Sequence, residues 1–353
     1  MYRNLKREKL ENKLIKREYY IDLLLKNLNK NKLIIGKPYV GKTTLLKEIV
    51  SKKDSIVYID TKRLGLSPEA FSVEFIETVA SYHKGKGVEL DDCRIKESTS
   101  LIVDKVKNEL EKIKPDQQLL VELAFTYAEE LGKEVGKEFT LCLDEFWKLL
   151  DMNNFSKIDI VEIFRKVSSS QSRTHYFLVS SYNELGKEIN KELKFELVEI
   201  LPLTLRECGD DDLYYYSQGM PLFLNSIKDK DVRNKFLRES LTKTGIIYNA
   251  CYKQLNEALD KARGKTLLVE ILKALCDNDG LRLNEISRKI YRSASVTKNL
   301  ITRLINVDLL VKEGNLFLFK DSVLKFWFRN YVQENDFDIE PGKDVMKKIE
   351  VDL

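Results

Sequence analysis

The sequence predicts an α/β fold in which helices cover an open parallel sheet, followed by a helical lid and a C-terminal winged helix-turn-helix. Three observations support this prediction. Short apolar runs alternate with segments of helical spacing in the N-terminal half, which is typical of a parallel sheet. A glycine-rich motif joins the first apolar run to a helical segment. Near the C-terminus, three segments of helical pattern precede a hairpin with a Gly314-Asn315 tip.

The glycine-rich motif occupies residues 36–44 and fits the pattern G-x-x-x-x-G-K-[ST]. It follows an apolar strand and opens a helix, which is the context of the phosphate site in the P-loop NTPase fold. Backbone N–H groups and the helix dipole would face the β-phosphate. Lys42 is expected to reach the β- and γ-phosphates, and the Thr43 hydroxyl to bind Mg²⁺. The predicted nucleotide-binding residues of this loop are Gly36, Lys37, Pro38, Tyr39, Val40, Gly41, Lys42, Thr43 and Thr44.

The strands and their boundaries divide the chain into four predicted parts. Strands are expected over residues 32–35, 55–60, 139–146, 175–181 and 195–202. These strands belong to a nucleotide-binding domain over residues 1–205, with a basic helix over 5–30 and a helical insertion over 67–138. A lid over 206–262, a winged helix-turn-helix over 263–335 and an acidic tail over 336–353 would follow. Ligands of such sheets bind at the carboxyl ends of the strands, so the residues there are the candidates for chemistry.

Two acidic residues end the third predicted strand. Asp144 is expected to hold Mg²⁺, and Glu145 to orient or deprotonate the attacking water, as in a Walker B pair. A helix cap at a strand end is the alternative interpretation. The phosphate loop at the same edge of the sheet favours catalysis, with Lys42, Asp144 and Glu145 as the catalytic residues.

The fourth predicted strand ends in Ser180 and Ser181, where a hydroxyl could contact the γ-phosphate or the attacking water. A simple helix or turn cap before Asn183-Glu184 is the alternative. Arg165 and Arg173 are the candidates for an arginine finger, although solvated surface charge also accounts for either residue.

Residues 288–303 contain five basic residues without an intervening acid, and Lys312 follows at the expected wing. A helix-turn-helix places its second helix in the major groove of DNA, where flanking basic residues contact phosphates. The predicted DNA-binding residues are Arg288, Lys289, Arg292, Lys298, Arg303 and Lys312, and Ser295, Thr297 and Asn299 could touch bases or backbone. A winged helix that contacts protein, or packs within the chain, is the alternative.

Composition excludes several other classes of protein. The formal net charge is only +4 among 60 basic and 56 acidic residues, so nucleic-acid binding must come from local clusters. The five cysteines are scattered without metal-binding spacing, and the two histidines argue against a histidine-based zinc site. The sequence shows no apolar run long enough to span a bilayer and no export signal at its start, so we expect a cytoplasmic protein without membrane contact.

The motifs together resemble the archaeal-type P-loop ATPases with a C-terminal winged helix, a family related to the AAA+ and STAND NTPases. The resemblance covers nearly the whole chain and is carried by Lys16-Arg17-Glu18, the 36–44 loop, Leu141–Phe146, Ser180-Ser181, Leu201-Pro202-Leu203, Gly219-Met220-Pro221 and Phe326-Trp327-Phe328-Arg329. It implies that Pro221 lies near the base of the nucleotide, where Arg17 is also expected. The family strand end more often reads Gly-Ser, so Ser180 departs from the pattern, and this bears on the sensor role expected of Ser181.

The sequence therefore predicts a molecular switch that binds and hydrolyses ATP with Mg²⁺ and releases ADP, with DNA as the partner of the winged helix. One alternative is a replication-initiator-like ATPase that remodels complexes on DNA. Another is an ATP-binding scaffold whose winged helix contacts a protein partner or a second copy of the chain.

Overall fold

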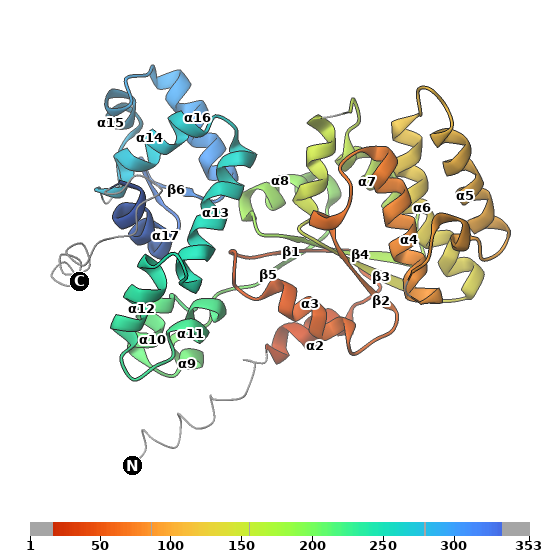
Figure 1. The fold of residues 1–353 in the computed structure, drawn as a ribbon, viewed down its shortest axis with the longest axis horizontal. Coiled ribbons are helices and arrows are strands. Elements are labelled where there is room, and N and C mark those ends of the chain that lie inside the picture. The colour runs from red at the N-terminus through yellow and green to blue at the C-terminus, as the bar shows by residue number, and fades with distance from the viewer. Residues whose placement is uncertain (1–16, 86, 155, 279, 334–353) are drawn as a thin grey trace, which may run out of the picture.

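The computed structural model describes residues 17–85, 87–154, 156–278 and 280–333. Its centre is a five-stranded sheet in the order β2-β3-β4-β1-β5, with every neighbouring pair parallel (Figure 1). The strands are β1 (Lys32–Ile35), β2 (Ile56–Asp60), β3 (Phe139–Asp144), β4 (Thr174–Ser180) and β5 (Glu196–Glu199). The register pairs Ile35 with Ser180, and Asp60 with Asp144, so the predicted strand ends meet at one edge. The prediction of an open parallel sheet is confirmed.

Helices cover both faces of this sheet. Along β1, Ile34 joins the apolar core under α2 (Glu18–Lys26) and α3 (Lys42–Val50). Its neighbours Leu33 and Ile35 join the core on the opposite face. That second core includes residues of α4 (Pro68–Lys84), α5 (Glu97–Leu110), α6 (Gln117–Val135), α7 (Ile160–Ser169) and α8 (Asn183–Leu193). Burial on both faces explains why the inner strands β1, β3 and β4 are largely apolar, whereas the edge strand β5 exposes both of its glutamates.

The predicted helices are found with shifted ends. The expected helix over residues 5–30 is represented by α2, and residues 5–16 lie outside the described residues. The insertion contains the three expected helices α4, α5 and α6, with Ser67 capping α4 through the N–H of Ala70. Helix α8 and the 3₁₀ helices η2 (Thr61–Arg63), η3 (Leu90–Cys93) and η4 (Phe146–Asn154) were not predicted as elements.

A group of helices follows β5 in the chain and lies beside the sheet (Figure 1). These are α9 (Leu205–Cys208), α10 (Asp211–Ser217), α11 (Pro221–Ile227), α12 (Val232–Leu241) and α13 (Ile246–Ala262). Gly219 precedes α11 with φ +68°, and a Cβ there would lie 2.1 Å from the carbonyl oxygen of Leu203. No larger residue fits that position, so the glycine fixes where the chain enters α11.

The last described elements form a compact C-terminal module, defined here as α14 to η5. It contains α14 (Lys265–Cys276), α15 (Leu283–Lys289), α16 (Ala294–Asn306), β6 (Leu310–Glu313), β7 (Leu316–Phe319), α17 (Ser322–Trp327) and η5 (Phe328–Gln333). β6 and β7 form an antiparallel hairpin, and Leu281 adds a bridge to Phe317. Buried Phe328 contacts Phe319 of β7, with ring centroids 5.7 Å apart, so this segment packs back onto the module as expected. Buried Trp327 contacts Tyr248 of α13, also with ring centroids 5.7 Å apart.

The predicted acidic tail over 336–353 lies outside the described residues. All five cysteines are buried and, within the described ranges, form no disulfide. Among the helices that the structure describes, none is both long and apolar enough to cross a bilayer.

Candidate nucleotide-binding site

The glycine loop wraps tightly between β1 and α3. A Cβ on Gly36 would lie 2.7 Å from the carbonyl oxygen of Ile200, so only glycine fits beside that strand end. Gly41 is the N-cap of α3 with φ +96°, and Tyr39 also has a positive φ of 64°. The first turn of a helix leaves its backbone N–H groups without acceptors within the helix. The loop therefore directs the positive end of α3 toward the pocket above it.

Lys42 is buried at the start of α3, where its ammonium donates to two carbonyls of the loop. The distances are 2.7 Å to the oxygen of Gly36 and 3.0 Å to that of Lys37. Burial lowers the pKa of Lys42 to about 8, although the carboxylates of Glu145 and Asp144 act in the opposite direction. An added anion beside this ammonium would raise its pKa again.

Thr43 and Asp144 meet across the sheet edge. The Thr43 hydroxyl donates to Asp144 Oδ2 at 2.7 Å, and the Tyr58 hydroxyl donates to the same oxygen at 2.9 Å. Burial raises the pKa of Asp144. Its other oxygen, Oδ1, is buried and has no hydrogen-bond partner among the described residues. A hydroxyl beside a carboxylate with an unused oxygen fits the hard oxygen ligands that Mg²⁺ prefers.

Glu145 follows Asp144 in a left-handed conformation with φ 57°. The Thr61 hydroxyl fixes this turn by donating to the carbonyl oxygens of Asp144, at 2.8 Å, and of Glu145, at 2.7 Å. The Glu145 side chain accepts from the Ser181 hydroxyl at 2.5 Å, from the Ser181 N–H at 3.3 Å and from the Trp147 indole N–H. The carboxylate is thus oriented by donors on two neighbouring strand ends.

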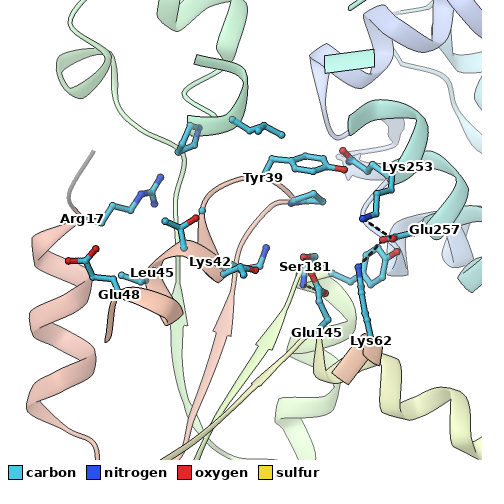
Figure 2. Close-up of a pocket in the computed structure, with 18 of the residues that line it drawn as sticks. Arg17, Tyr39, Lys42, Leu45, Glu48, Lys62, Glu145, Ser181, Lys253 and Glu257 are labelled. Carbon is cyan, nitrogen blue, oxygen red and sulfur yellow. Dashed lines mark hydrogen bonds and ion pairs between the residues drawn. The ribbon is translucent and has the colours of Figure 1, made fainter. Parts of the chain in front are cut away.

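These residues border a pocket of about 450 Å³ above the carboxyl edge of the sheet. Figure 2 shows Lys42, Ser181 and Glu145 at its centre, with Arg17 on one side and Lys62 on the other. Of the predicted site residues, Arg17, Pro38, Tyr39, Gly41, Lys42, Thr43, Thr44, Glu145, Ser181 and Pro221 line it. Residues from five separate segments of the sequence are therefore gathered around one cavity.

Four predicted site residues do not line the pocket: Gly36, Lys37 and Val40 of the loop, and Asp144 at the end of β3. Val40 and Asp144 are buried beneath the loop. The Lys37 ammonium instead donates to the carbonyl oxygen of Lys320, at 3.5 Å, in the C-terminal module. Ser180 closes a local turn, since its hydroxyl donates to the carbonyl oxygen of Tyr182 and accepts from the N–H of the same residue.

The two candidate arginine fingers do not line the pocket of their own chain. Arg165 is exposed on α7. Arg173 precedes β4 at the end of the strand opposite to Ser180, and its backbone N–H donates to Glu129 at 2.9 Å. Neither residue is brought to the site by the fold of this chain.

The far wall of the pocket comes from residues that sequence reasoning missed. Leu222 and Asn225 line it from α11, and Lys253, Gln254 and Glu257 from α13. Glu257 forms ion pairs with Lys62 of η2 at 3.1 Å and with Lys253 at 3.9 Å (Figure 2). The Tyr39 hydroxyl also donates to the carbonyl oxygen of Ala250 at 2.9 Å. No motif marks these positions, and only the helical spacing of residues 253, 254 and 257 places them on one face.

The predicted DNA-binding residues all lie in the C-terminal module, away from the pocket. Arg288, Lys289, Arg292, Lys298, Arg303 and Lys312 are exposed, and within the described part of the chain none forms an ion pair. Ser295 and Asn299 are also exposed. Thr297 is fully buried, and its hydroxyl donates to the carbonyl oxygen of Ser293 at 2.9 Å. The expectation that Thr297 could contact DNA is therefore wrong, because its side chain faces the core of the module.

At the level of sequence, no protein-family model and no curated protein matches the chain. Solved structures do resemble it. A Walker-type ATPase of Pyrococcus abyssi has a TM-score of 0.65 at 18% identity, with 90% of this chain and 96% of that chain covered. Two further structures overlap less well.

One of these two is the Cdc6p protein of Pyrobaculum aerophilum, with a TM-score of 0.36, 13% identity and coverage of 90% and 95%. The other is a STAND protein of Pyrococcus horikoshii with a tetratricopeptide repeat sensor, with a TM-score of 0.35, 15% identity and coverage of 88% and 42%. At these identities the comparisons concern the fold. This chain therefore shares its α/β fold with the Walker-type ATPase of Pyrococcus abyssi.

Proposed function

We propose that this protein binds Mg-ATP in the 450 Å³ pocket and hydrolyses it, acting as a nucleotide-controlled switch. The observation that carries the proposal is the convergence of Lys42, Thr43 and Glu145 on that pocket, with Asp144 directly beneath Thr43. A glycine loop that only formed a turn would not require a buried ammonium beside two buried or half-buried acids.

Each side chain has a role in this reaction. The α3 N-terminus and Lys42 would hold the phosphates, since both present positive charge to one point. Glu145 would orient the attacking water and receive its proton, because the Ser181 and Trp147 donors hold its carboxylate at the pocket rim. Thr43 and Asp144 would hold Mg²⁺, which neutralises charge on the β- and γ-phosphates when bound.

Arg17 and Pro221 mark the base side of the pocket. Arg17 Nη1 donates to the carbonyl oxygen of Leu201 at 2.6 Å, which anchors the side chain at the pocket margin. Leu222 and Leu45 add apolar surface on which a purine ring can stack. We infer adenine as the base, in agreement with the Walker-type ATPase that shares this fold.

The order of elements in the C-terminal module supports a winged helix-turn-helix that binds duplex DNA. Helices α14, α15 and α16 precede the β6–β7 hairpin, and α16 would be the recognition helix. The six exposed basic residues near it would meet phosphates. We propose residues 1–205, 206–262 and 263–335 as the nucleotide-binding domain, the lid and the DNA-binding module.

A protein-binding scaffold is the second candidate, and a specific observation favours it. Tyr291 is 87% exposed and Val296 is 44% exposed, both close to the basic residues. Exposed apolar side chains of this size often mark contact with protein. The same module could therefore dock a protein partner in place of DNA.

A turnover assay separates these functions. Phosphate release from ATP is measured with Mg²⁺, with a chelator, and with Mg²⁺ plus duplex DNA. Mg-dependent release supports the proposal, and a change on adding DNA assigns the module to DNA. Release that DNA leaves unchanged, together with no DNA binding, favours the scaffold for the module. No release, with ATP still bound, contradicts hydrolysis.

A further inference from the structure

The C-terminal module inserts a buried carboxylate at the N-terminus of α8. Asp308, between α16 and β6, accepts hydrogen bonds from the backbone N–H of Asn183 and, at 3.4 Å, from that of Glu184. The N-cap residue of α8, Tyr182, makes no side-chain capping bond itself. A helix of the nucleotide-binding domain is therefore capped from 125 positions away in the sequence.

This cap is built for its position. Asp308 is 8% exposed, and its backbone has φ 59°, a left-handed conformation that Asp tolerates better than most residues. The Lys320 ammonium donates to Asp308 Oδ1 at 2.6 Å, which compensates the buried charge. The next acidic neighbour of Lys320 is Glu184, at 4.0 Å. The contact thus joins a partly buried ion pair to a helix end, with the carboxylate itself buried.

Helix α8 begins two residues after Ser181, the residue that orients Glu145. The residue between them, Tyr182, stacks edge-on against Trp147 with ring centroids 4.8 Å apart. Trp147 donates its indole N–H to Glu145. Both side chains that hold the Glu145 carboxylate are therefore in contact with the short segment that Asp308 anchors.

The C-terminal module also contacts the glycine loop. Lys37 donates to the carbonyl oxygen of Lys320, whose ammonium pairs with Asp308. Two adjoining contacts of one module thus reach the phosphate-binding loop and the segment that positions the proposed base.

We propose that Asp308 is a positioning residue for hydrolysis: by capping α8 from the C-terminal module, it holds Ser181 where that residue orients the Glu145 carboxylate. This inference rests on the proposed function of Glu145. It makes seating of the C-terminal module a condition for full turnover, so that a partner displacing the module would slow hydrolysis without entering the pocket.

The test compares Asp308→Gly with Asp308→Asn. Glycine removes the cap and is at ease at φ 59°, whereas asparagine retains an acceptor for the helix end. We expect Asp308→Gly to lower kcat about tenfold with little change in KM, a smaller loss than the ~10²–10⁴-fold that a general base supplies. Asp308→Asn should restore kcat to within about threefold of the parent, since it still caps the helix. Should Asp308→Gly not fold, Asp308→Ser, whose short hydroxyl cannot make both contacts, takes its place with the same expected direction.

Two further arms distinguish positioning from loss of stability. Asp116→Ala removes another helix cap, which accepts from the N–H of Leu119 in α6 of the insertion, and should leave kcat unchanged. In a Ser181→Ala background, Asp308→Gly should have little additional effect, because both changes act through one contact. A kcat that Asp308→Gly leaves unchanged or raises, or a loss that adds fully to that of Ser181→Ala, overturns the inference.

A spectroscopic readout keeps the inference separate from the proposed function. The chain has two tryptophans, so the indole N–H signals of ¹⁵N-tryptophan-labelled protein can be assigned with Trp147→Phe. Asp308→Gly should shift or broaden the Trp147 signal, and Asp308→Asn should not. If the parent shows no turnover but the Trp147 signal responds in this way, hydrolysis is wrong and the coupling holds. An unperturbed Trp147 signal in Asp308→Gly refutes the coupling.

Discussion

The Thr43 hydroxyl donates a 2.7 Å hydrogen bond to the Asp144 carboxylate across 101 residues of sequence. This bond joins the first turn of α3 to the end of β3. Helix α3 follows β1, and β4 lies between β1 and β3 in the sheet. It leaves Asp144 Oδ1 buried and without a partner among the described residues. The two side chains that would hold Mg²⁺ are thus already adjacent in the protein alone.

Replacing Glu145 with Gln should separate binding from turnover. The amide retains the shape of the side chain and can still meet the Ser181 N–H, but it cannot accept a proton from water. We expect ATP affinity within about threefold of the parent and kcat lower by ~10²–10⁴-fold. Isothermal titration and phosphate release give the two values. Hydrolysis by Glu145→Gln at the parent rate would show that another group positions the water.

Lys42 should make nucleotide binding depend on pH. Its pKa in the nucleotide-free protein is about 8, and neighbouring phosphates would raise that pKa. Binding then takes up a proton above pH 8, so affinity should fall as pH rises further. Calorimetry in two buffers of different ionisation heat should show uptake of most of a proton at about pH 9 and almost none at about pH 7. Lys42→Ala should lose binding at either pH.

The same lysine should also affect folding stability. Because its pKa is lowered from 10.5 on folding, the unfolded chain binds more protons than the folded chain between about pH 8 and 10.5. The contribution of Lys42 to the free energy of unfolding must therefore rise with pH across that window. Urea titrations should show that the free energy of unfolding of the parent rises relative to that of Lys42→Met as the pH increases through this window. A difference that stays constant would contradict the lowered pKa.

ATP should bind more tightly than GTP. The base side of the pocket presents Arg17, Pro221 and apolar surface, and we infer that it accommodates adenine. A margin of about tenfold corresponds to ~1.4 kcal/mol, roughly one hydrogen bond to the base. Competition of each nucleotide against a fluorescent ATP analogue measures the ratio. Equal affinities would mean that the pocket reads the phosphates alone.

The parts of this site that could be predicted from sequence are those in which neighbouring residues act together. The 36–44 loop and the Asp144-Glu145 pair are contiguous motifs, and each follows an apolar strand. Because the carboxyl ends of parallel strands lie at one edge of the sheet, the two motifs could be expected to lie close together. Trp147 and the α13 residues could not be predicted, because only tertiary packing brings them to the pocket.

Helix α8 shows the same limit in a single element. Its N-cap residue, Tyr182, lacks the short polar side chain that marks a helix start. The missing acceptor is supplied by Asp308, far along the chain, so the sequence offered a cap before Asn183 only as an alternative and did not define the helix. The order of the inner strands was likewise beyond local reasoning, since β1, β3 and β4 have a similar apolar composition.

DNA binding by the C-terminal module should be mainly electrostatic and should depend on both flanks of α16. Thr297, Leu300, Ile301 and Leu304 face the core, which leaves Ser295, Lys298, Asn299 and Arg303 toward solvent. Lys298 and Arg303 are five positions apart, or ~140° around a helix, so they border the exposed face on opposite sides. A helix lying in the major groove would bring one of them to each phosphate backbone.

Replacing both residues by alanine should therefore flatten the slope of log affinity against log salt by about two units, since each phosphate contact contributes roughly 0.9. Fluorescence anisotropy with labelled duplex over a range of salt concentrations measures that slope. Lys105→Ala with Lys114→Ala is the matched control, because both lysines are exposed in the helical insertion and the net charge changes equally. ATP turnover without DNA should be the same in all three proteins. Parent-like DNA binding by the Lys298 and Arg303 double variant would instead assign this face of the module to protein contact, with Tyr291 and Val296 as its apolar centre.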